Sequence, residues 1–150
     1  MAYTINLTVR NRTGDTLTVV EKACWHYANG GTWTERHGQH ILSMGGSGTS
    51  GMLRFQSSSG DIFSVVLGIH NYKPWCDVQV KLRDEDTTAT MLPEYYSGGK
   101  FSNRANPELK NVDVSENRGL DLVFETTEGH ELSAVLDYFE VWRAVQKRVY

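Results

Sequence analysis

Three segments of the chain combine glycine, amide, hydroxyl and aromatic residues, the mixture that a carbohydrate-binding site requires. They are residues 25–33, 45–51 and 70–75. Sugar hydroxyls pair with neutral donors and acceptors such as amides, serine hydroxyls and backbone N–H groups, and the C–H face of a pyranose lies well on an aromatic ring. The same composition fits an alternative in which the glycines only form turns and the aromatic residues only form core. The pattern leaves both interpretations open.

No catalytic or nucleotide-binding motif fits its context. Residues 46–51 match the spacing G-x-G-x-x-G, but residues 52–55 read as a strand, so no helix follows whose N-terminus could face a pyrophosphate. Thr49 stands where a nucleophile elbow needs its second glycine. No nucleophile, base and orienting group can be assembled from the remaining residues. We therefore expect a protein that is not an enzyme and uses no cofactor.

Metal and thiol chemistry lack support as well. His37 and His40 could begin a metal site, but no third and fourth ligand accompanies them at a compatible spacing, so we expect no metal. The acidic run at residues 84–86 is most simply a solvated turn. Cys24 and Cys76 lie far apart and form no C-x-x-C pair, which predicts two reduced, partly buried thiols.

Charge, length and hydropathy exclude several classes of partner. Fifteen Lys and Arg residues against eighteen Asp and Glu residues give a formal charge of -3, which leaves no basic surplus for nucleic acid. No apolar run approaches the ~20 residues that cross a bilayer, so we expect no integral membrane association. The 150 residues suit a single domain. Residues 1–10 show no secretory signal pattern, and the expected location is cytoplasmic.

Short strands separated by turn signals dominate the chain. Tyr3, Ile5, Leu7 and Val9 alternate with polar residues, which predicts a strand with one buried face. Residues 17–20 resume the apolar pattern after a turn, and we predict that these first two strands pair. Clusters of Gly and Ser favour an all-β sandwich or barrel over alternating β-α units. Further strands are expected at residues 40–44, 52–55, 62–69, 75–82 and 120–125.

Two stretches depart from this pattern. Residues 93–109 hold two of the three prolines and little alternation, which predicts a loop-helix connection between two sheets, with a helix that could open at residues 106–109. The last stretch is ambiguous, and we predict a strand to about Asp137 followed by an amphipathic helical tail over residues 139–150. An exposed apolar stripe on this helix would favour aggregation, so we expect it to be buried against the sandwich or against another subunit. The stripe consists of Phe139, Trp142, Val145 and Val149.

Several strings of the sequence resemble one known family. They look like fungal fruit-body lectins of the button-mushroom agglutinin type, in order and at nearly ungapped spacing. The resemblance covers roughly residues 3–139 and is strongest at residues 25–77. It implies one lectin domain over residues 1–150, in which residues 1–139 are the family-like sandwich and 140–150 are an extension. The strings are residues 27–33, 44–51, 53–55, 70–73, 75–77, 94–96 and 127–129.

The resemblance implies a fold, an assembly and a ligand. The fold is a two-sheet β-sandwich joined by a helix-loop-helix, similar to the actinoporins, in a homotetramer or a smaller homo-oligomer such as a dimer. The ligands are glycans ending in galactose or N-acetylgalactosamine, notably the Galβ1-3GalNAc disaccharide (T-antigen) of glycoproteins and glycolipids. The alternative is an actinoporin-like, pore-forming protein, which the strand pattern of residues 1–10 disfavours because pore formation of that kind needs an amphipathic helix. The positions that match the disaccharide site are Ala28, Asn29, Gly30, Ser47, Gly48, His70, Asn71 and Tyr72.

Two departures from the family pattern bear on binding. Pro74 replaces a usual arginine, which removes a backbone N–H and a charge at the rim of the first site. A second family site, for terminal N-acetylglucosamine, has polar residues at three positions that are apolar here. We expect its loss, although Lys100 or Arg104 could substitute because the alignment near residue 101 is loose. The positions matching the second site are Asp77, Val78, Val80, Phe101 and Val112.

Overall fold

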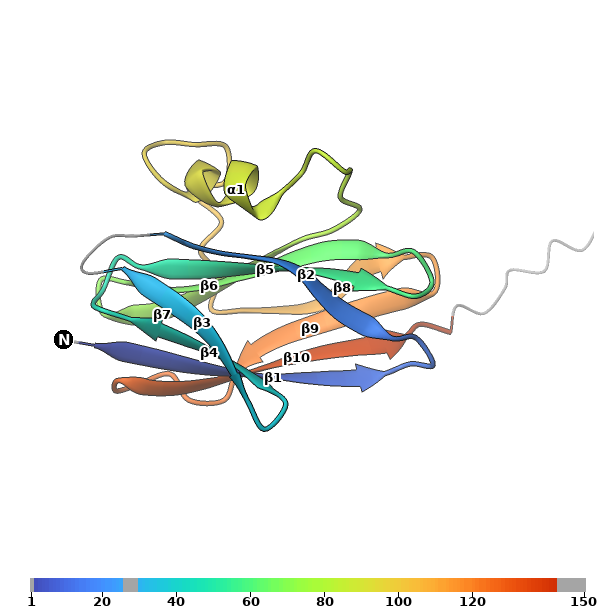
Figure 1. Ribbon diagram of the computed structural model, residues 1–150, viewed down its shortest axis with the longest axis horizontal. Helices are drawn as coiled ribbons and strands as arrows, with labels where there is room; N and C mark the ends of the chain where they lie inside the picture. Colours follow the sequence, from blue (N-terminus) through green and yellow to red (C-terminus); the bar gives the residue numbers. More distant parts are fainter. Residues whose placement is uncertain (1, 26–29, 143–150) are drawn as a thin grey trace, which may run out of the picture.

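The computed structural model describes residues 2–25 and 30–142, which fold into two stacked β-sheets (Figure 1). The strands are β1 (Tyr3–Arg12), β2 (Leu17–Trp25), β3 (Gly31–Arg36), β4 (Gln39–Met44), β5 (Ser50–Ser57), β6 (Ile62–His70), β7 (Lys73–Gln79), β8 (Glu108–Ser115), β9 (Arg118–Phe124) and β10 (Glu131–Glu140). A six-stranded sheet has the order β3-β4-β1-β10-β9-β8, and a four-stranded sheet has the order β2-β5-β6-β7. The expected all-β, two-sheet sandwich is confirmed.

The main core lies between the two sheets and is built from their alternating inward side chains. Phe55, Phe63 and Tyr138 form a run of stacked rings, with centroid separations of 5.2 Å and 5.6 Å. Because these rings come from β5, β6 and β10, they connect the four-stranded sheet to the six-stranded one. All three side chains are essentially inaccessible to solvent.

A helical segment covers the outer face of the four-stranded sheet. It consists of α1 (Thr88–Met91) and the 3-10 turn η1 (Leu92–Tyr95), and Figure 1 shows α1 above β2, β5 and β6. Met91 and Leu92 pack there against Met52 of β5 and Val66 of β6. β5 and β6 are therefore buried on both faces, which explains why residues 62–69 read as a continuous apolar run.

The acidic run at residues 84–86 is the expected surface turn, and a buried arginine anchors it. Arg54 of β5 is only 6% exposed. Its guanidinium donates to the backbone oxygens of Asp86 at 2.7 Å and Arg83 at 3.0 Å. It also pairs with Glu21 of β2 at 3.2 Å, so its charge is compensated although it is buried.

The prediction that the first two strands pair is wrong. β1 lies between β4 and β10 in the six-stranded sheet, whereas β2 pairs with β5 in the other sheet. Side chains close the connecting turn: the Asn11 Oδ1 accepts from the Thr13 N–H at 3.1 Å, and the Thr13 hydroxyl accepts from the Asp15 N–H at 3.0 Å. These bonds to the backbone two residues ahead build a wide turn in place of a tight hairpin, and the chain crosses between the sheets.

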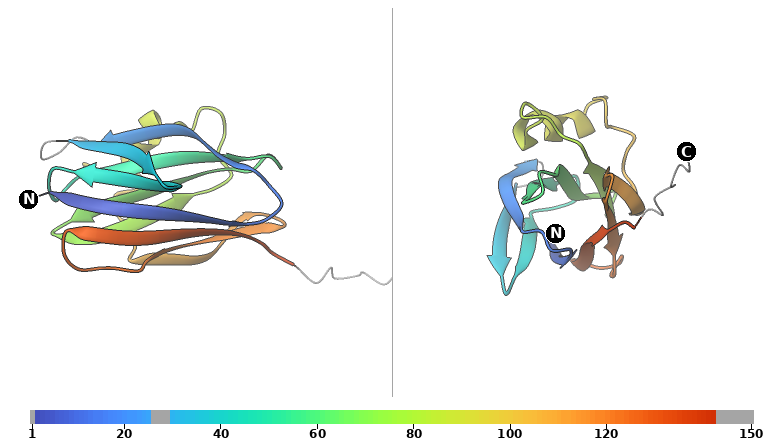
Figure 2. Two further views of the ribbon diagram at one scale, coloured as in Figure 1. Left: turned by 60° about the horizontal axis from the view of Figure 1, so that its bottom comes forward. Right: turned by 90° about the vertical axis from the view of Figure 1, so that its right-hand side faces the viewer.

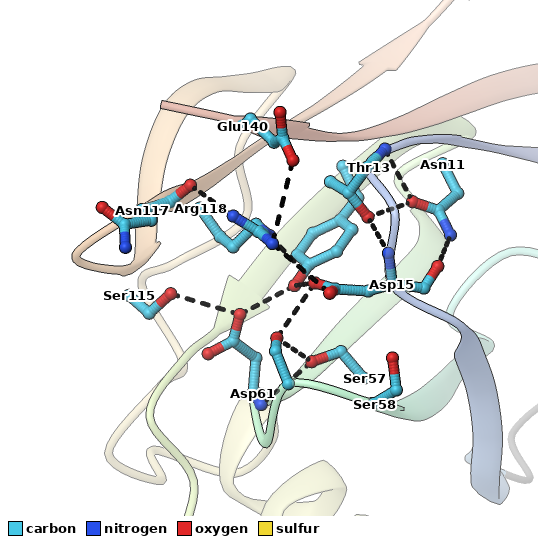
Figure 3. A network of polar contacts seen from close by, with 12 residues as sticks. Asn11, Thr13, Asp15, Ser57, Ser58, Asp61, Ser115, Asn117, Arg118 and Glu140 are labelled. Carbon is cyan, nitrogen blue, oxygen red and sulfur yellow. Dashed lines mark hydrogen bonds and ion pairs between the residues drawn. The ribbon is translucent and has the colours of Figure 1, made fainter. Parts of the chain in front are cut away.

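The crossing ends in a polar cluster at one end of the sandwich, where Figure 3 shows Asp15, Asp61 and Arg118 close together. We call these three residues, with the Tyr138 hydroxyl that contacts both carboxylates, the polar clasp. The Tyr138 hydroxyl contacts Asp61 Oδ2 at 2.7 Å and Asp15 Oδ2 at 3.1 Å. The Arg118 Nε donates to Asp15 Oδ2 at 2.9 Å, and this bond lowers the pKa of the Asp15 carboxyl below its usual value. Burial raises the pKa of Tyr138 to about 12. The clasp joins the β1-β2 turn to β6, β9 and β10.

Residues 93–109 form the expected connection, but the helical turns lie earlier, at residues 88–95. The Thr87 hydroxyl caps α1 by accepting from the Thr90 N–H, and Pro93 occupies the first turn of η1. The helix that could open at residues 106–109 does not form. Asn106 forms a bridge with Cys76, with N–H to O distances of 2.8 Å and 3.0 Å, and β8 begins two residues later. The sequence pattern identifies neither β8 nor β3.

The strand at the C-terminus is longer than the alternation indicates. β10 runs to Glu140, so Phe139 and Glu140 belong to a strand and a helix starting at Phe139 is wrong. The reason is that Phe139 pairs with Gly119 and Glu140 pairs with Arg118 of β9, so the neighbouring hairpin extends the ladder. The other tail prediction, covering residues 143–150 with Val145 and Val149, lies outside the described residues. Figure 2 shows β10 beside β1 in the six-stranded sheet.

Candidate functional site

A pocket of about 420 Å³ opens at the end of the four-stranded sheet opposite the polar clasp. The β4-β5 loop, the β6-β7 turn and the end of β2 meet there with the residue that follows η1. Its walls combine hydroxyl, amide and imidazole groups with three aromatic rings, and none of these side chains is an acid, a lysine or an arginine. The pocket is lined by Trp25, Ser47, Gly48, His70, Asn71, Tyr72 and Tyr96.

The β6-β7 turn presents the most exposed ring of the pocket. Asn71 and Tyr72 have φ values of 49° and 64°, the left-handed pair that a two-residue type I′ hairpin needs. Asparagine tolerates this conformation, but a bulky residue such as tyrosine is strained in it. The Tyr72 side chain is 77% exposed, so no core packing explains its presence at this position. Backbone strain combined with an exposed ring is typical of a binding surface.

The β4-β5 loop is fixed against this turn by short hydrogen bonds. The Tyr72 N–H donates to the Ser47 hydroxyl oxygen at 3.0 Å. The Gly48 N–H donates to the Ile69 carbonyl at 2.7 Å, and the Ile69 N–H donates to the Thr49 carbonyl at 3.0 Å. Gly48 has a φ of 91°, which an L side chain rarely adopts. The two loops therefore form one preorganised unit.

Neutral polar groups and a stacked pair of rings complete the pocket. The Asn71 Nδ2 lies 3.3 Å from the His70 Nε2, within hydrogen-bond distance. Trp25 and Tyr96 stack with centroids 4.3 Å apart and an interplanar angle of 8°. The Tyr96 hydroxyl is bonded to the Ser50 hydroxyl, and burial raises the pKa of Tyr96. The described part of the wall therefore carries no acid, lysine or arginine side chain and is partly aromatic.

Most of the first predicted site is gathered in this pocket. Ser47, Gly48, His70, Asn71 and Tyr72 all line it. The Gly30 carbonyl accepts from the Gly45 N–H at 3.0 Å, which places Gly30 beside the β4-β5 loop. Ala28 and Asn29 lie outside the described residues.

The predicted site residues omit two rings of the pocket, Trp25 and Tyr96. Trp25 belongs to one of the segments with carbohydrate-like composition, and Tyr96 belongs to one of the family-like strings. The position of each residue in such a segment is the sequence signal that could have identified it as a site residue. The connection that folds over the sheet brings Tyr96 to Trp25, which no local pattern indicates.

Asp77, the first residue of the second predicted site, is enclosed. The side chain is 0% exposed. Its carboxylate accepts from the Tyr95 hydroxyl at 2.6 Å, from Gln79 and Asn106 at 3.1 Å, and from the Arg104 Nε at 3.0 Å. This bonding raises the pKa of Arg104, and burial raises the pKa of Tyr95. The carboxylate therefore connects β7 to the connection after η1.

The other four residues of the second predicted site do not gather around Asp77. Val78, Val80 and Val112 belong to the main core between the sheets. Phe101 packs on the outer side with Tyr95, at a centroid separation of 5.2 Å. Of the two cations that could substitute, Arg104 pairs with Asp77, whereas Lys100 lies 5.3 Å from the centroid of the Phe101 ring.

The described residues also bear on a metal site, on the state of the two cysteines and on a membrane-spanning helix. In residues 2–25 and 30–142, no group of three or more His, Cys, Asp or Glu side chains could hold a metal ion. The predicted free thiols are confirmed, and burial raises the pKa of Cys24 to about 11 and that of Cys76 to about 12. Among the described helices, none has the length and apolar character needed to cross a membrane.

Comparison with known proteins agrees with the fold. The fungal fruit body lectin family model matches residues 1–136. Boletus edulis lectin, from Boletus edulis, is 43% identical over 138 residues, which cover 89% of this chain and 96% of that protein. Crystal structures of Xerocomus chrysenteron lectin superpose with a TM-score of 0.86. The wild-type structure is 38% identical and covers 92% of this chain and 99% of its own, and a methionine-substituted variant is 40% identical with 92% and 98% covered. This chain belongs to the fungal fruit body lectin family and is a carbohydrate-binding, non-catalytic protein.

Proposed function

We propose that this lectin binds glycans ending in galactose or N-acetylgalactosamine, notably Galβ1-3GalNAc, in the pocket between the β4-β5 loop and the β6-β7 turn. The observation that carries the proposal is the convergence of uncharged donors and acceptors beside the exposed Tyr72 ring. A sugar diol needs neutral partners on one side and an apolar surface on the other. The pocket offers both without any metal ion.

Specific groups are available for this recognition. The Ser47 hydroxyl accepts from the Tyr72 N–H, so its own proton remains for a sugar oxygen. The Asn71 amide supplies a further donor and an acceptor at the tip of the turn. Because both loops are already held by backbone hydrogen bonds, little ordering is needed on binding.

Calorimetric titration with Galβ1-3GalNAc tests the proposal. Asn71→Gly removes the amide and keeps the left-handed turn, because glycine accepts a φ of 49° without strain. We expect affinity to fall by about 1–3 kcal/mol, the cost of an unpaired sugar hydroxyl. Asn117→Ala, an exposed asparagine in the β8-β9 hairpin at the other end of the sandwich, is the matched control and should bind like the parent. An Asn71→Gly variant that binds as tightly as the parent contradicts the assignment.

We further propose that the second sugar site is lost. Asp77 is enclosed by donors of this chain, and Val80 and Val112 contribute to the core, so these positions offer no free polar group to N-acetylglucosamine. A glycan array should show no binding to chitobiose-terminated glycans. Clear binding that Arg104→Ala abolishes would overturn this part of the proposal.

Pore formation, the alternative function, fits the topology poorly. Detaching the N-terminal segment would break the ladders of β1 with both β4 and β10. β1 also contributes the fully buried Ile5 and Leu7 to the core. Leakage of dye from liposomes is the direct test, and we expect none.

A further inference from the structure

A second cavity of about 250 Å³ lies directly beside the pocket described above, and we call it the annex. Gly48, His70 and Tyr96 line both, so the two cavities are immediate neighbours. The floor of the annex consists of Trp75, Tyr95 and Phe101.

The floor of the annex is aromatic carbon. The Trp75 and Tyr95 ring centroids are 5.5 Å apart, and Tyr95 and Phe101 are 5.2 Å apart. The Tyr95 hydroxyl is already bonded to Asp77, and the Tyr96 hydroxyl is bonded to Ser50. Both tyrosines therefore present their rings to the annex while their polar ends are occupied.

The rim of the annex is small and exposed. Ser97, Ser102 and Ala105 belong to the connection between η1 and β8, and all three are open to solvent. The connection is held in place because the Phe101 N–H donates to the Glu94 carbonyl at 2.9 Å and Arg104 pairs with Asp77. The annex is therefore preformed and has a solvent-exposed rim.

We propose that the annex binds an apolar, ring-sized aglycone. The aglycone is the group joined to the anomeric oxygen of the sugar in the first pocket, so this inference rests on the proposed function. A further sugar fits less well, because hydroxyls that point toward the floor would lose water against ring faces, and the hydroxyls of Tyr95 and Tyr96 are already bonded. An apolar ring buries its faces against Trp75, Tyr95 and Phe101 at no such cost. Covalent linkage to the bound sugar makes this second contact intramolecular and so strengthens a weak interaction.

The test compares the methyl and benzyl α-glycosides of Galβ1-3GalNAc by calorimetric titration. The parent should bind the benzyl glycoside roughly tenfold more tightly, since the phenyl ring leaves water for an apolar floor. Phe101→Ala should remove this difference and leave the methyl glycoside unaffected. Val20→Ala, a truncation of a 44%-exposed apolar residue on β2, is the matched control and should preserve the difference.

A second variant, which fills the annex with a larger side chain, keeps the test valid if Phe101→Ala fails to fold. Ala105→Trp changes an exposed rim residue and places a ring in the annex, so it should also equalise the two glycosides. Equal affinity of the two glycosides for the parent overturns the inference while the proposed function stands. A persistent preference for the benzyl glycoside in both annex variants overturns it as well. Failure of the parent to bind even the methyl glycoside overturns the proposed function itself.

Discussion

Replacing Tyr138 with phenylalanine should weaken the fold through the loss of one oxygen atom. The Tyr138 ring is completely buried and would remain in its stack, but the two carboxylates of the polar clasp would lose a shared donor. Asp15 keeps Arg118 at 2.9 Å and Ser59 at 2.9 Å. Among the described residues, the Asp61 carboxylate keeps only the longer contact from the Ser115 hydroxyl, at 3.2 Å. Removing the hydroxyl therefore deprives mainly Asp61, whose Oδ2 lies 2.7 Å from it, of a hydrogen-bond donor.

A hydrogen bond to a charged group contributes about 1.5–3 kcal/mol, so we expect the free energy of unfolding to fall by about 2 kcal/mol. Urea unfolding followed by circular dichroism measures this directly. Tyr3→Phe is the matched control, because Tyr3 is 4% exposed and its hydroxyl has no hydrogen-bond partner in the part of the chain that the structure describes. If Tyr138→Phe changes stability no more than Tyr3→Phe does, the reasoning about the clasp is refuted.

The clasp also predicts how stability depends on pH. Arg118 depresses the folded pKa of Asp15, so this carboxyl stabilises the fold fully above its ordinary pKa of 3.8, and the contribution is lost as the pH falls through the lower folded value. Tyr138 has a folded pKa raised to about 12 from an ordinary 10.0, so its contribution is full below pH 10 and is lost as the pH rises toward 12. Tyr138→Phe should remove this part of the alkaline loss, while Cys24, Cys76 and Tyr95, whose pKa values burial also raises, keep their own contributions. Sugar affinity should not change in this variant, because the clasp lies at the opposite end of β5 and β6 from the pocket.

Three further predictions concern Tyr72, Arg104 and the C-terminal segment. Tyr72→Gly should weaken sugar binding in calorimetry without lowering the melting temperature, because glycine accepts the φ of 64° that strains tyrosine; a lower melting temperature would contradict the assigned strain. Arg104→Ala should lower the free energy of unfolding by about 1–3 kcal/mol, because the buried Asp77 loses a charged donor, while binding of the methyl glycoside stays constant. Ending the chain after Trp142 removes Val145 and Val149, and light scattering should show a smaller assembly; an unchanged mass would exclude an assembly role for this segment.

Sequence patterns located the strands better than they located their partners. The alternation of Tyr3, Ile5 and Leu7 identified β1 and its buried face, and all three residues lie in the core. The partners of β1 could not be read from it, because the side-chain bonds of Asn11 and Thr13 decide that the chain leaves the sheet at residue 13. Similarly, a helix at residues 106–109 is prevented by the bridge of Asn106 to Cys76, a residue distant in sequence.

The first candidate site was accessible to sequence analysis because each of its loops is local. Ser47 and Gly48 lie in one short loop, and His70, Asn71 and Tyr72 lie in one tight turn, so strings of a few residues contain them. Whether the residues of the second predicted site can bind a sugar depends on which of their side chains face the core and which face outward. A linear alignment cannot show that Val80 and Val112 enter the core while Phe101 remains outside it.

The parallel pairing of β1 with β10 also has a consequence for biosynthesis. Thr4 pairs with Glu131 and Arg12 with Phe139, so β1, which leaves the ribosome long before β10, receives one of its two neighbours from the last described strand. Until then, β1 exposes an unpaired backbone edge and half of an apolar face, both of which favour aggregation. The antiparallel ladder with β4 forms from nearer residues and can protect one edge earlier. The six-stranded sheet can therefore close only after translation of β10, and this long-range parallel pairing is expected to be a slow step of folding.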